Sequence, residues 1–493
     1  MVNLMKAIRH TCSLILLAGL GLAGCVTVGP DYAPPELDVP PAWGRIDTAA
    51  KPVTTHAAAS RDIGQWWQSL NDPLLTGLID EALQANHDLR SAQARLRQAR
   101  AQRTVAVAGH YPDVTASGSA SRSRSSEETG SGTTSNYYSA GFDASWEVDV
   151  FGGVRRGVEA AEADLESSEA SLAHTRVTLV SEVALGYVEM RSLQIRLGIA
   201  RDNLASQSDT LQITEWRAQA GLTSIQDVAQ ARSNREQTRA QVPALETSLA
   251  EAEHSLDILL GKSPGTLHAR LAEAAGLPTI PVEIAVNIPA ETLRQRPDVR
   301  AAERTLAAET ARLSVTESAR YPSFNLSGSI GLEALKFSAL GNSGAAALSL
   351  LAGITAPIFN AGRLRAQVEI QDAAREQAQI TYEQTVLTAL QDVENALVAL
   401  ARSQERIEAL GNAAVSTRVA AELARQRYST GLIDFQSVLD TERTLLSNED
   451  SLASARADGV LALIRLYKAL GGGWTPDSAS GAPITTTQHS DTP

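Results

Sequence analysis

The sequence predicts a mainly α-helical protein with a smaller set of transmembrane β-strands and an internal two-fold repeat. Three observations support this fold class. Ala, Leu, Gln, Glu and Arg dominate the middle of the 493-residue chain and only 4% of residues are aromatic, which is typical of long helices. Four segments alternate apolar with small or polar residues, which is the period of a β-strand. Finally, Tyr111-Pro112 recurs as Tyr321-Pro322, 210 residues further along.

The repeat divides the chain into two similar halves. Each half is expected to contain a helix, two β-like segments, a very long helix and a shorter helix. We place repeat 1 at residues 66–265 and repeat 2 at residues 291–473, with a linker at 266–290 and a flexible tail at 474–493. Two further motifs share the offset: Gly221-Leu222 with Gly431-Leu432, and Leu259-Leu260-Gly261 with Ala469-Leu470-Gly471.

The N-terminus has the features of a targeting signal. Lys6 and Arg9 precede an apolar run at 14–22 that is too short to span a bilayer. The run ends in Leu22-Ala23-Gly24-Cys25, which resembles a bacterial lipoprotein cleavage site. We expect residues 1–24 to be a signal peptide and Cys25 to carry a diacylglycerol thioether and an N-acyl chain. The alternative is a secretory signal followed by a chance cysteine.

The segment that follows Cys25 is expected to be extended. Five prolines lie between residues 30 and 41, and each fixes its backbone φ and removes an amide donor. We interpret residues 25–65 as a lipidated tether.

Composition and motifs argue against two other classes of protein. The net charge is −13 and the chain has no basic cluster, so it is a poor candidate for binding nucleic acid. The eight histidines are scattered, and neither a His-Glu-x-x-His motif nor a Gly-x-Ser-x-Gly motif is present. We expect no catalytic residues, no metal site, no cofactor other than the lipid, and no enzymatic activity.

Helical patterns precede the strands in both halves. A helix is expected from Asp72, and Asn86-His87-Asp88 interrupts it. Asp88 is expected to cap a second helix from Leu89 to about Gly109. In the second half, Pro297 suits the start of a helix, and Asp298 can cap that helix or complement its macrodipole.

Four strands are expected, at about residues 113–122, 138–150, 323–332 and 348–358. Each has about 10 residues, the length of a transmembrane β-strand. A soluble, half-buried sheet would give the same alternation, but the lipoprotein signal and the long loops favour the membrane. Four strands cannot close a barrel, and open edges are not tolerated in hydrocarbon. The barrel must therefore be shared between chains, with eight, twelve or sixteen strands, and Asp143, Glu147 and Asp149 should face its wet lumen.

Two very long helices and two shorter ones complete the repeats. Residues 157–220 contain no proline, and 64 residues at about 1.5 Å each would span about 96 Å. Residues 364–430 are the counterpart. Helices at about 223–260 and 435–470 should run back antiparallel, and Pro243 should kink the first of these. The alternative is a plain coiled coil, which is compatible with the same function.

These segments together resemble the outer membrane factors of tripartite efflux and type I export systems, which are TolC-like, and within them the lipidated NodT subgroup. The resemblance covers residue 25 to about residue 474. It is carried by Pro30-Asp31-Tyr32-Ala33-Pro34-Pro35, Trp66-Trp67, Asp72-Pro73-Leu74 with Leu78-Ile79, Arg296-Pro297-Asp298-Val299-Arg300-Ala301-Ala302-Glu303, and Tyr428-Ser429-Thr430-Gly431 with Leu439-Asp440.

The resemblance implies a homotrimer in the bacterial outer membrane. Four strands per chain would form a shared 12-stranded β-barrel, continuous with a long α-helical barrel in the periplasm. The implied function is a passive duct that exports small molecules such as drugs or toxic compounds. The implied partners are a periplasmic adaptor, an inner-membrane pump of the RND type and outer membrane lipid. The alternative function is a duct for peptides or polysaccharides, as in type I secretion.

The resemblance also implies a periplasmic gate. The turns at Gly221 and Gly431 should form the tip, where glycine supplies a positive φ. In the family, tip residues close the tunnel through contacts between helices, and by motif position these are Asp227, Tyr428 and Asp440. Three copies of Asp227 or Asp440 would line a cation-favouring constriction. The alternative is that these acids are solvated helix-terminus residues.

The gate motif departs from the family in one respect and from the repeat in another. The family often has an arginine directly after the tyrosine, whereas here Ser429 follows Tyr428 and Arg427 precedes it. The repeat partners of Asp440 and Tyr428 are Gln230 and Ala218. We therefore expect the gate where the two copies differ. A periplasmic coiled-coil scaffold remains a rival, and protease access to the loops 122–136 and 333–347 on intact cells would exclude it.

Overall fold

A computed structural model of the chain describes residues 27–36, 39–44, 53–54, 63–281, 284–285 and 289–475. The expected signal peptide, the expected lipidation site Cys25 and almost all of the tail lie outside these residues. The chain forms two compact units. The first contains Arg95–Ser168 and Ala301–Glu383 together with the N-terminal segment up to Glu36, and the second contains the remainder.

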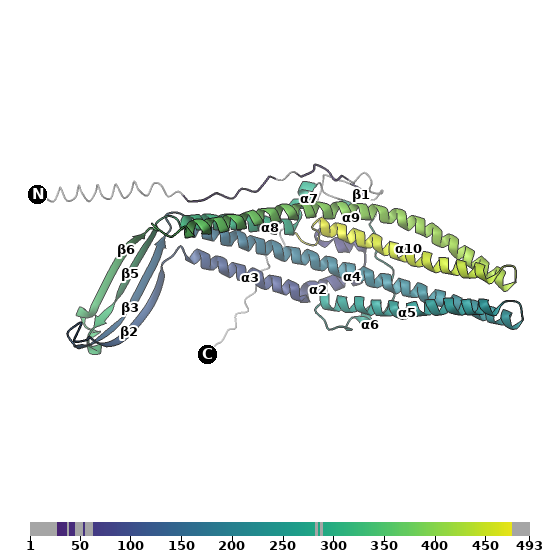
Figure 1. The fold of residues 1–493 in the computed structure, drawn as a ribbon, viewed down its shortest axis with the longest axis horizontal. Helices are drawn as coiled ribbons and strands as arrows, with labels where there is room; N and C mark the ends of the chain where they lie inside the picture. Colours follow the sequence, from purple (N-terminus) through teal and green to yellow (C-terminus); the bar gives the residue numbers. More distant parts are fainter. Residues whose placement is uncertain are drawn as a thin grey trace, which may run out of the picture. The chain divides into compact units, whose positions relative to one another are not determined.

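The helices repeat in length as well as in order (Figure 1). Helices α3 (His87–Ala108) and α8 (Pro297–Ser318) each have 22 residues. Helices α4 (Gly153–Gln219) and α9 (Arg363–Ser429) each have 67, and α5 (Ile225–Leu259) and α10 (Phe435–Ala469) each have 35. At about 1.5 Å per residue, the longest helices each extend about 100 Å.

Side-chain caps fix where the first helices begin. Asp72 accepts hydrogen bonds from the amides of Leu74 and Leu75, both at 3.0 Å, and starts α2 (Pro73–Ala85). The expected cap of α3 was wrong. Asn86, not Asp88, accepts the Leu89 amide at 2.9 Å, and Asp88 lies inside the first turn. There its carboxylate faces the positive end of the helix macrodipole.

Helix α5 runs through Pro243 as one continuous element. Proline has no amide hydrogen and therefore removes one backbone hydrogen bond of the helix, but the helix continues before and after it. The carbonyl that loses its helical donor is that of Arg239, four residues before the proline.

Four antiparallel strands form one sheet in the first unit (Figure 1). They are β2 (Asp113–Arg124), β3 (Thr134–Val148), β5 (Ser323–Ala334) and β6 (Ala346–Thr355), in the spatial order β2-β3-β5-β6. Strand β3 begins earlier than the sequence suggested and ends at Val148. Two short 3-10 turns, Phe337–Ala339 and Ser343–Ala345, lie between β5 and β6.

The structure corrects the position of Asp149, which we expected on a strand. It lies beyond the end of β3, where its carboxylate accepts the amides of Val154 at 3.2 Å and Arg155 at 2.9 Å and pairs with the Arg155 side chain. These bonds satisfy orphan donors at the start of α4, which explains why an acid is favoured there.

The register separates a polar from an apolar face of the sheet. Asp143 pairs with Thr115 on one side and Ser329 on the other, and Glu147 pairs with Asn325. Because side chains alternate along a strand, these residues share one face. The opposite face carries the large apolar residues: Trp146 with Leu326, Phe142 with Ile330, and Leu348, Leu350 and Ile354 on β6.

The segment that follows the lipidation motif is held against helices of the first unit. The Asp31 carboxylate pairs with Arg156 of α4 at 2.5 Å. Tyr32 donates to Glu303 of α8 at 3.2 Å, and the Arg304 guanidinium lies 5.5 Å from the centre of the Tyr32 ring. The first part of the expected tether, up to Glu36, is thus extended but attached to α4 and α8.

The second unit contains the main hydrophobic core. Trp66 and Trp67 of the 3-10 segment η3 (Ile63–Leu70) are almost fully buried, and Trp66 stacks on Tyr467 of α10 with ring centres 5.1 Å apart. Leu75, Leu78 and Ile79 of α2 pack into the same cluster. Two short helices, α6 (His268–Leu271) and α7 (Pro289–Gln295), and the parallel pair β1 (Val53–Thr54) and β4 (Ile284–Ala285) complete the unit.

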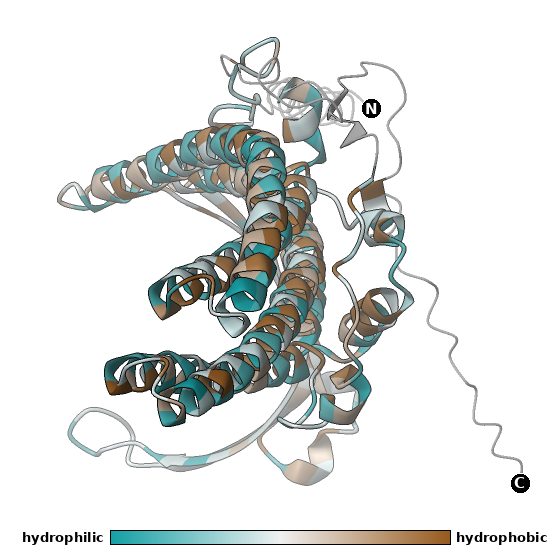
Figure 2. Cartoon of the chain, turned by 90° about the vertical axis from the view of Figure 1, so that its right-hand side faces the viewer, coloured by the Kyte–Doolittle hydropathy of each residue, from teal (hydrophilic) through white to brown (hydrophobic). Residues whose placement is uncertain are grey.

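Polar and apolar residues are mixed along the helices of the chain (Figure 2). Among the described residues, none of the helices combines the length and the apolar character needed to cross a membrane.

Candidate functional site

The two turns that join the long helices have the same backbone geometry. In the first, the Leu222 amide donates to the Arg217 carbonyl at 2.8 Å and the Gly221 amide to the Ala218 carbonyl at 3.0 Å. In the second, Leu432 and Gly431 make the equivalent bonds at the same two distances. This is the Schellman ending of a helix, in which glycine adopts a positive φ. Gly221 has φ 74° and Gly431 has φ 79°.

The helices that leave the turns are capped differently. Ser224 caps α5, and Asp227 completes a capping box by accepting the Ser224 amide at 3.1 Å. The Thr223 hydroxyl also donates to Asp227, and chiefly for that reason the pKa of Asp227 is lowered. Asp434 caps α10 by accepting the Ser437 amide at 3.0 Å.

Tyr428 joins the two helical hairpins. Its side chain is only 2% exposed, and its hydroxyl donates to the Thr214 hydroxyl at 3.2 Å. The Arg217 guanidinium lies 4.6 Å from the ring centre, and its Nη1 also donates to the Tyr428 carbonyl. Thr214 and Arg217 belong to α4 and Tyr428 to α9, so this contact links repeat 1 to repeat 2.

A small apolar group, which we call the turn cluster, surrounds Tyr428. Phe435 lies beside it with ring centres 5.9 Å apart. The buried members of the turn cluster are Leu211, Ala231, Ala424, Tyr428, Phe435, Val438 and Leu439.

The expected gate residues have three different environments. Tyr428 is buried, Asp227 is half-buried and engaged in the capping box, and Asp440 is exposed. The Asp440 carboxylate accepts a hydrogen bond from Gln436 at 2.9 Å. Asp227 therefore has the helix-terminus role that the alternative interpretation proposed, whereas Asp440 is available at the surface of α10.

Sequence reasoning missed Arg217. In the sequence, the basic residue next to Tyr428 is Arg427. Its side chain is exposed and makes no hydrogen bond or ion pair with any residue that the structure describes. The repeat partner of Arg427 is Arg217, which makes the contact instead. The repeat could have identified Arg217, because it lies 210 residues before Arg427. Equivalent ends of α4 and α9 lie close together when the two hairpins pack against each other.

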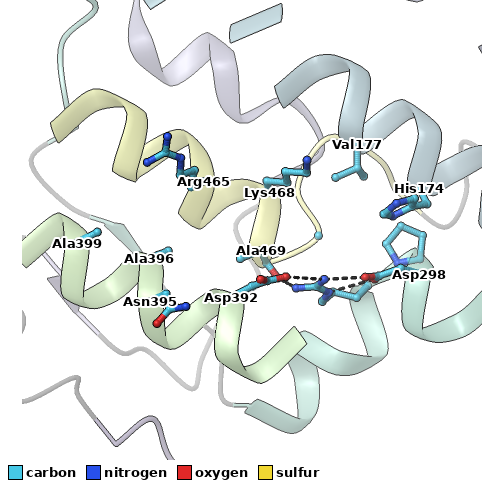
Figure 3. A pocket seen from close by; sticks show the side chains of 13 residues that line it. His174, Val177, Asp298, Asp392, Asn395, Ala396, Ala399, Arg465, Lys468 and Ala469 are labelled. Atoms are coloured by element: carbon cyan, nitrogen blue, oxygen red, sulfur yellow. Dashed lines mark hydrogen bonds and ion pairs between the residues drawn. The ribbon is translucent and has the colours of Figure 1, made fainter. Parts of the chain in front are cut away.

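Arg296, Asp298 and Asp392 form a cluster of charged side chains that lines a cavity of about 360 Å³ at the start of α8 (Figure 3). Arg296 pairs with Asp298 at 2.6 Å and Asp392 at 3.1 Å, and it donates to the carbonyls of Ala389 and Ala469. Burial opposes ionisation of Asp298, but the hydrogen bond and charge of Arg296 outweigh it and lower the pKa of Asp298. The bonds tie α8 to α9 and α10, which is a structural role.

Comparison with known protein families matches the chain twice. The profile of the outer membrane efflux protein family covers residues 78–262 and again residues 288–472. The two matches coincide with the two sets of helices and strands described above.

Individual relatives cover nearly the whole chain. Nodulation protein T of Rhizobium leguminosarum bv. trifolii is 32% identical over 485 residues, which is 97% of this chain and 100% of the relative. The probable outer membrane lipoprotein SilC of Salmonella typhimurium is 30% identical and covers 92% of this chain and 96% of its own. Among solved structures, the outer-membrane channel OprN has a TM-score of 0.85 and 37% identity, covering 91% of this chain and 99% of its own.

Proposed function

Because this chain belongs to the outer membrane efflux protein family and is the outer membrane channel of a tripartite efflux system, we propose that it is a passive duct that closes at the turns containing Gly221 and Gly431. The observation that carries this proposal is the contact of Arg217 and Thr214 with Tyr428. It joins the two hairpins at their turns, where a small displacement of α9 and α10 would change the width of a passage between helices.

The strands support the outer part of the duct. Three chains with four strands each form a closed 12-stranded barrel, which removes the open edges of β2 and β6. The apolar face of the sheet contacts lipid. The polar face, with Asp143 and Glu147, lines the lumen. Asp149 is not part of this lining, because its carboxylate is bound to the first turn of α4.

The acids near the turns give the closed entrance its charge. Asp440 is exposed on α10 and has no cationic partner among the described residues. Three copies of Asp440 form the negative ring, and Asp227 adds charge while it holds the first turn of α5. Such a ring favours cations over anions when the gate is closed.

The remaining parts of the proposal concern attachment and partners. Cys25 carries the lipid, in agreement with the description of SilC as a probable outer membrane lipoprotein. A periplasmic adaptor and an inner-membrane pump of the RND type complete the system, and energy comes from the pump. Exported cargo includes drugs or other toxic compounds.

Single-channel conductance in planar bilayers tests the gate. Arg217→Ala removes the guanidinium from Tyr428, a contact worth about 1 kcal/mol, and should raise the open-to-closed ratio roughly fivefold. Asp440→Ala combined with Tyr428→Phe should also raise conductance. Arg427→Ala is the matched control, because Arg427 is the exposed repeat partner of Arg217. Equal conductance of the Arg217→Ala and Arg427→Ala variants would show that the gate lies elsewhere.

A further inference from the structure

A row of buried polar side chains on α4 leads to the turn cluster. Asn203, Gln207, Thr210 and Thr214 are spaced three or four residues apart, so they lie on one face of the helix. Their exposed fractions are 7%, 3%, 4% and 0%. Nearer the middle of α4 the buried positions include Leu193, Leu197 and Ala200 beside Arg191 and Ser192. Towards the turns, four successive buried side chains on one face are polar, and we call this face the polar seam.

The internal repeat does not share this polarity. The equivalent positions on α9 are Ala413, Thr417, Ala420 and Ala424. Three of the four polar side chains of α4 thus correspond to alanines in a helix of the same length. Polar residues at a helix seam cost stability, and their best-attested benefit is control over how helices pack.

The seam contacts α10 and α9 through hydrogen bonds. The Thr210 hydroxyl donates to Oε1 of Glu442 at 2.6 Å, and the Asn203 amide donates to Oε2 of Glu449 at 3.2 Å, both on α10. At its end, Thr214 accepts the Tyr428 hydroxyl of α9. The polar seam of α4 therefore contacts both α10 and Tyr428, the residue that links the hairpins.

Glu442 is the exceptional member of this row. Its side chain is 4% exposed, and within the described residues the hydrogen bond from Thr210 is the single partner of its carboxyl. Burial raises the pKa of Glu442 above its usual value, only partly offset by Thr210 and by Arg425. A carboxylate with one donor is poorly satisfied in such a site, whereas the protonated acid is not.

The charged groups around Glu442 already have other partners. Arg425 of α9 donates to the Ser206 hydroxyl of α4. Arg443, next to Glu442 on α10, donates to Asn234 of α5 at 3.0 Å. Glu449 pairs with Arg418 of α9 at 2.6 Å. No cation among the described residues forms an ion pair with Glu442.

Gln207 supplies a second, unused hydrogen-bonding group. It lies one turn of α4 before Thr210, and both atoms of its amide are buried without a partner among the described residues. It borders a cavity of about 630 Å³ between α4, α5 and α10. An amide without a partner and a cavity therefore lie beside the seam that contacts Glu442.

We propose that Glu442 is a proton-sensitive latch of the gate: the protonated acid holds α10 against α4, and ionisation releases α10 and opens the passage. This inference rests on the proposed location of the gate at the turns. Since the packed seam favours the protonated acid, its stabilisation is present at low pH and is lost as the pH rises through the raised pKa. In the open state water reaches the Glu442 carboxyl, and the protonated form is no longer favoured there. Acid therefore closes the channel and neutral pH favours opening.

The test is the conductance of the full-length channel in planar bilayers at about pH 5 and about pH 8, because a raised pKa moves the titration of a glutamate above its ordinary range. The open-to-closed ratio of the native channel should increase with pH, by about tenfold for each unit by which the two states differ in pKa. Glu442→Gln keeps the shape of the side chain and cannot ionise, so its channel should stay mostly closed at both pH values. Glu408→Gln, at an exposed position of α9, is the matched control and should retain the native response.

Thr210→Val provides a second variant. It removes the donor that favours the carboxylate, so the midpoint of the pH response should move to higher pH without being abolished. A Glu442→Gln channel that responds to pH like the native one would overturn the inference. If Arg217→Ala raises conductance in the same bilayers, that failure concerns the latch alone. If Arg217→Ala has no effect either, the location of the gate itself is wrong.

Discussion

Arg217 and Arg427 occupy equivalent positions at the ends of the two longest helices, yet only Arg217 lies over an aromatic ring. The difference follows from the neighbouring position, where Tyr428 corresponds to Ala218. One substitution between the repeats therefore turns a symmetric pair of helix ends into an asymmetric contact.

The hydrogen bond between Tyr428 and Thr214 should contribute measurably to stability. Tyr428→Phe and Thr214→Val each remove one partner of a buried bond and should each lower the free energy of unfolding by about 1 kcal/mol. The double variant should lose little more than either single variant, because both remove the same bond. Thermal unfolding of the purified protein measures this, and fully additive losses would contradict the contact.

Arg296 should be far less tolerant of substitution than a nearby arginine. It is 7% exposed, it pairs with the half-buried Asp298 and the exposed Asp392, and it donates to two backbone carbonyls, so Arg296→Ala removes all of these bonds and should cost about 2 to 3 kcal/mol. Arg294→Ala is the control, because its ion pair with Glu291 is exposed and should change stability by less than about 0.5 kcal/mol. Denaturant unfolding compares the two, and similar losses would refute the structural role of Arg296.

At the scale of elements, the two identical helix endings depend on glycine. Gly221→Ala and Gly431→Ala each place a side chain at a positive φ and should each cost about 1 kcal/mol. Gly411 lies within α9, and a methyl group there meets no atom within 4 Å. Gly411→Ala should therefore stabilise the helix by about 0.5 to 1 kcal/mol. An unfolding temperature that falls in Gly221→Ala and Gly431→Ala but rises in Gly411→Ala would support this assignment. A lower unfolding temperature in all three variants would contradict it.

Local sequence signals predict some element boundaries and miss others for a physical reason. Asp72 is the first good cap before an apolar period, and it does start α2. Asn86 and Asp88 are both good caps two residues apart, and the sequence alone does not decide between them. Asn86 is used because its amide also donates to the Leu259 carbonyl at 2.9 Å, a contact 173 residues away. The alternation of apolar and polar residues likewise predicts β3, but it does not show that pairing with the neighbouring strand ends at Val148, before Asp149.

The candidate functional residues divide in the same way, into those with a local sequence signal and those without one. Gly221 and Gly431 could be identified because a positive φ at a helix end leaves a local signature. Arg217, Thr214 and Glu442 could not, because their importance arises only when α4 packs against α9 and α10. The family resemblance and the mainly helical fold with membrane-type strands are confirmed by the family match and by the likeness to OprN.

At the scale of the whole molecule, the placement of the chain in the outer membrane gives a prediction about accessibility. On intact cells, trypsin should cleave near Arg124 or Lys336, which lie at the outer ends of the strands and are exposed. Arg427 at the turns should be cut only after the outer membrane is permeabilised. Peptide mapping before and after permeabilisation distinguishes the two. Cleavage of Arg427 on intact cells would contradict the proposed orientation.

The equal lengths of the paired helices restrict where insertions and deletions can occur in the sequence. Both α4 and α9 have 67 residues, and both α5 and α10 have 35, whereas β3 has 15 and β6 has 10. One residue inserted into a long helix rotates everything beyond it by about 100° and moves every seam residue off its partner. Insertions and deletions should therefore accumulate in the loops between strands, while the long helices should tolerate substitution but almost no change of length.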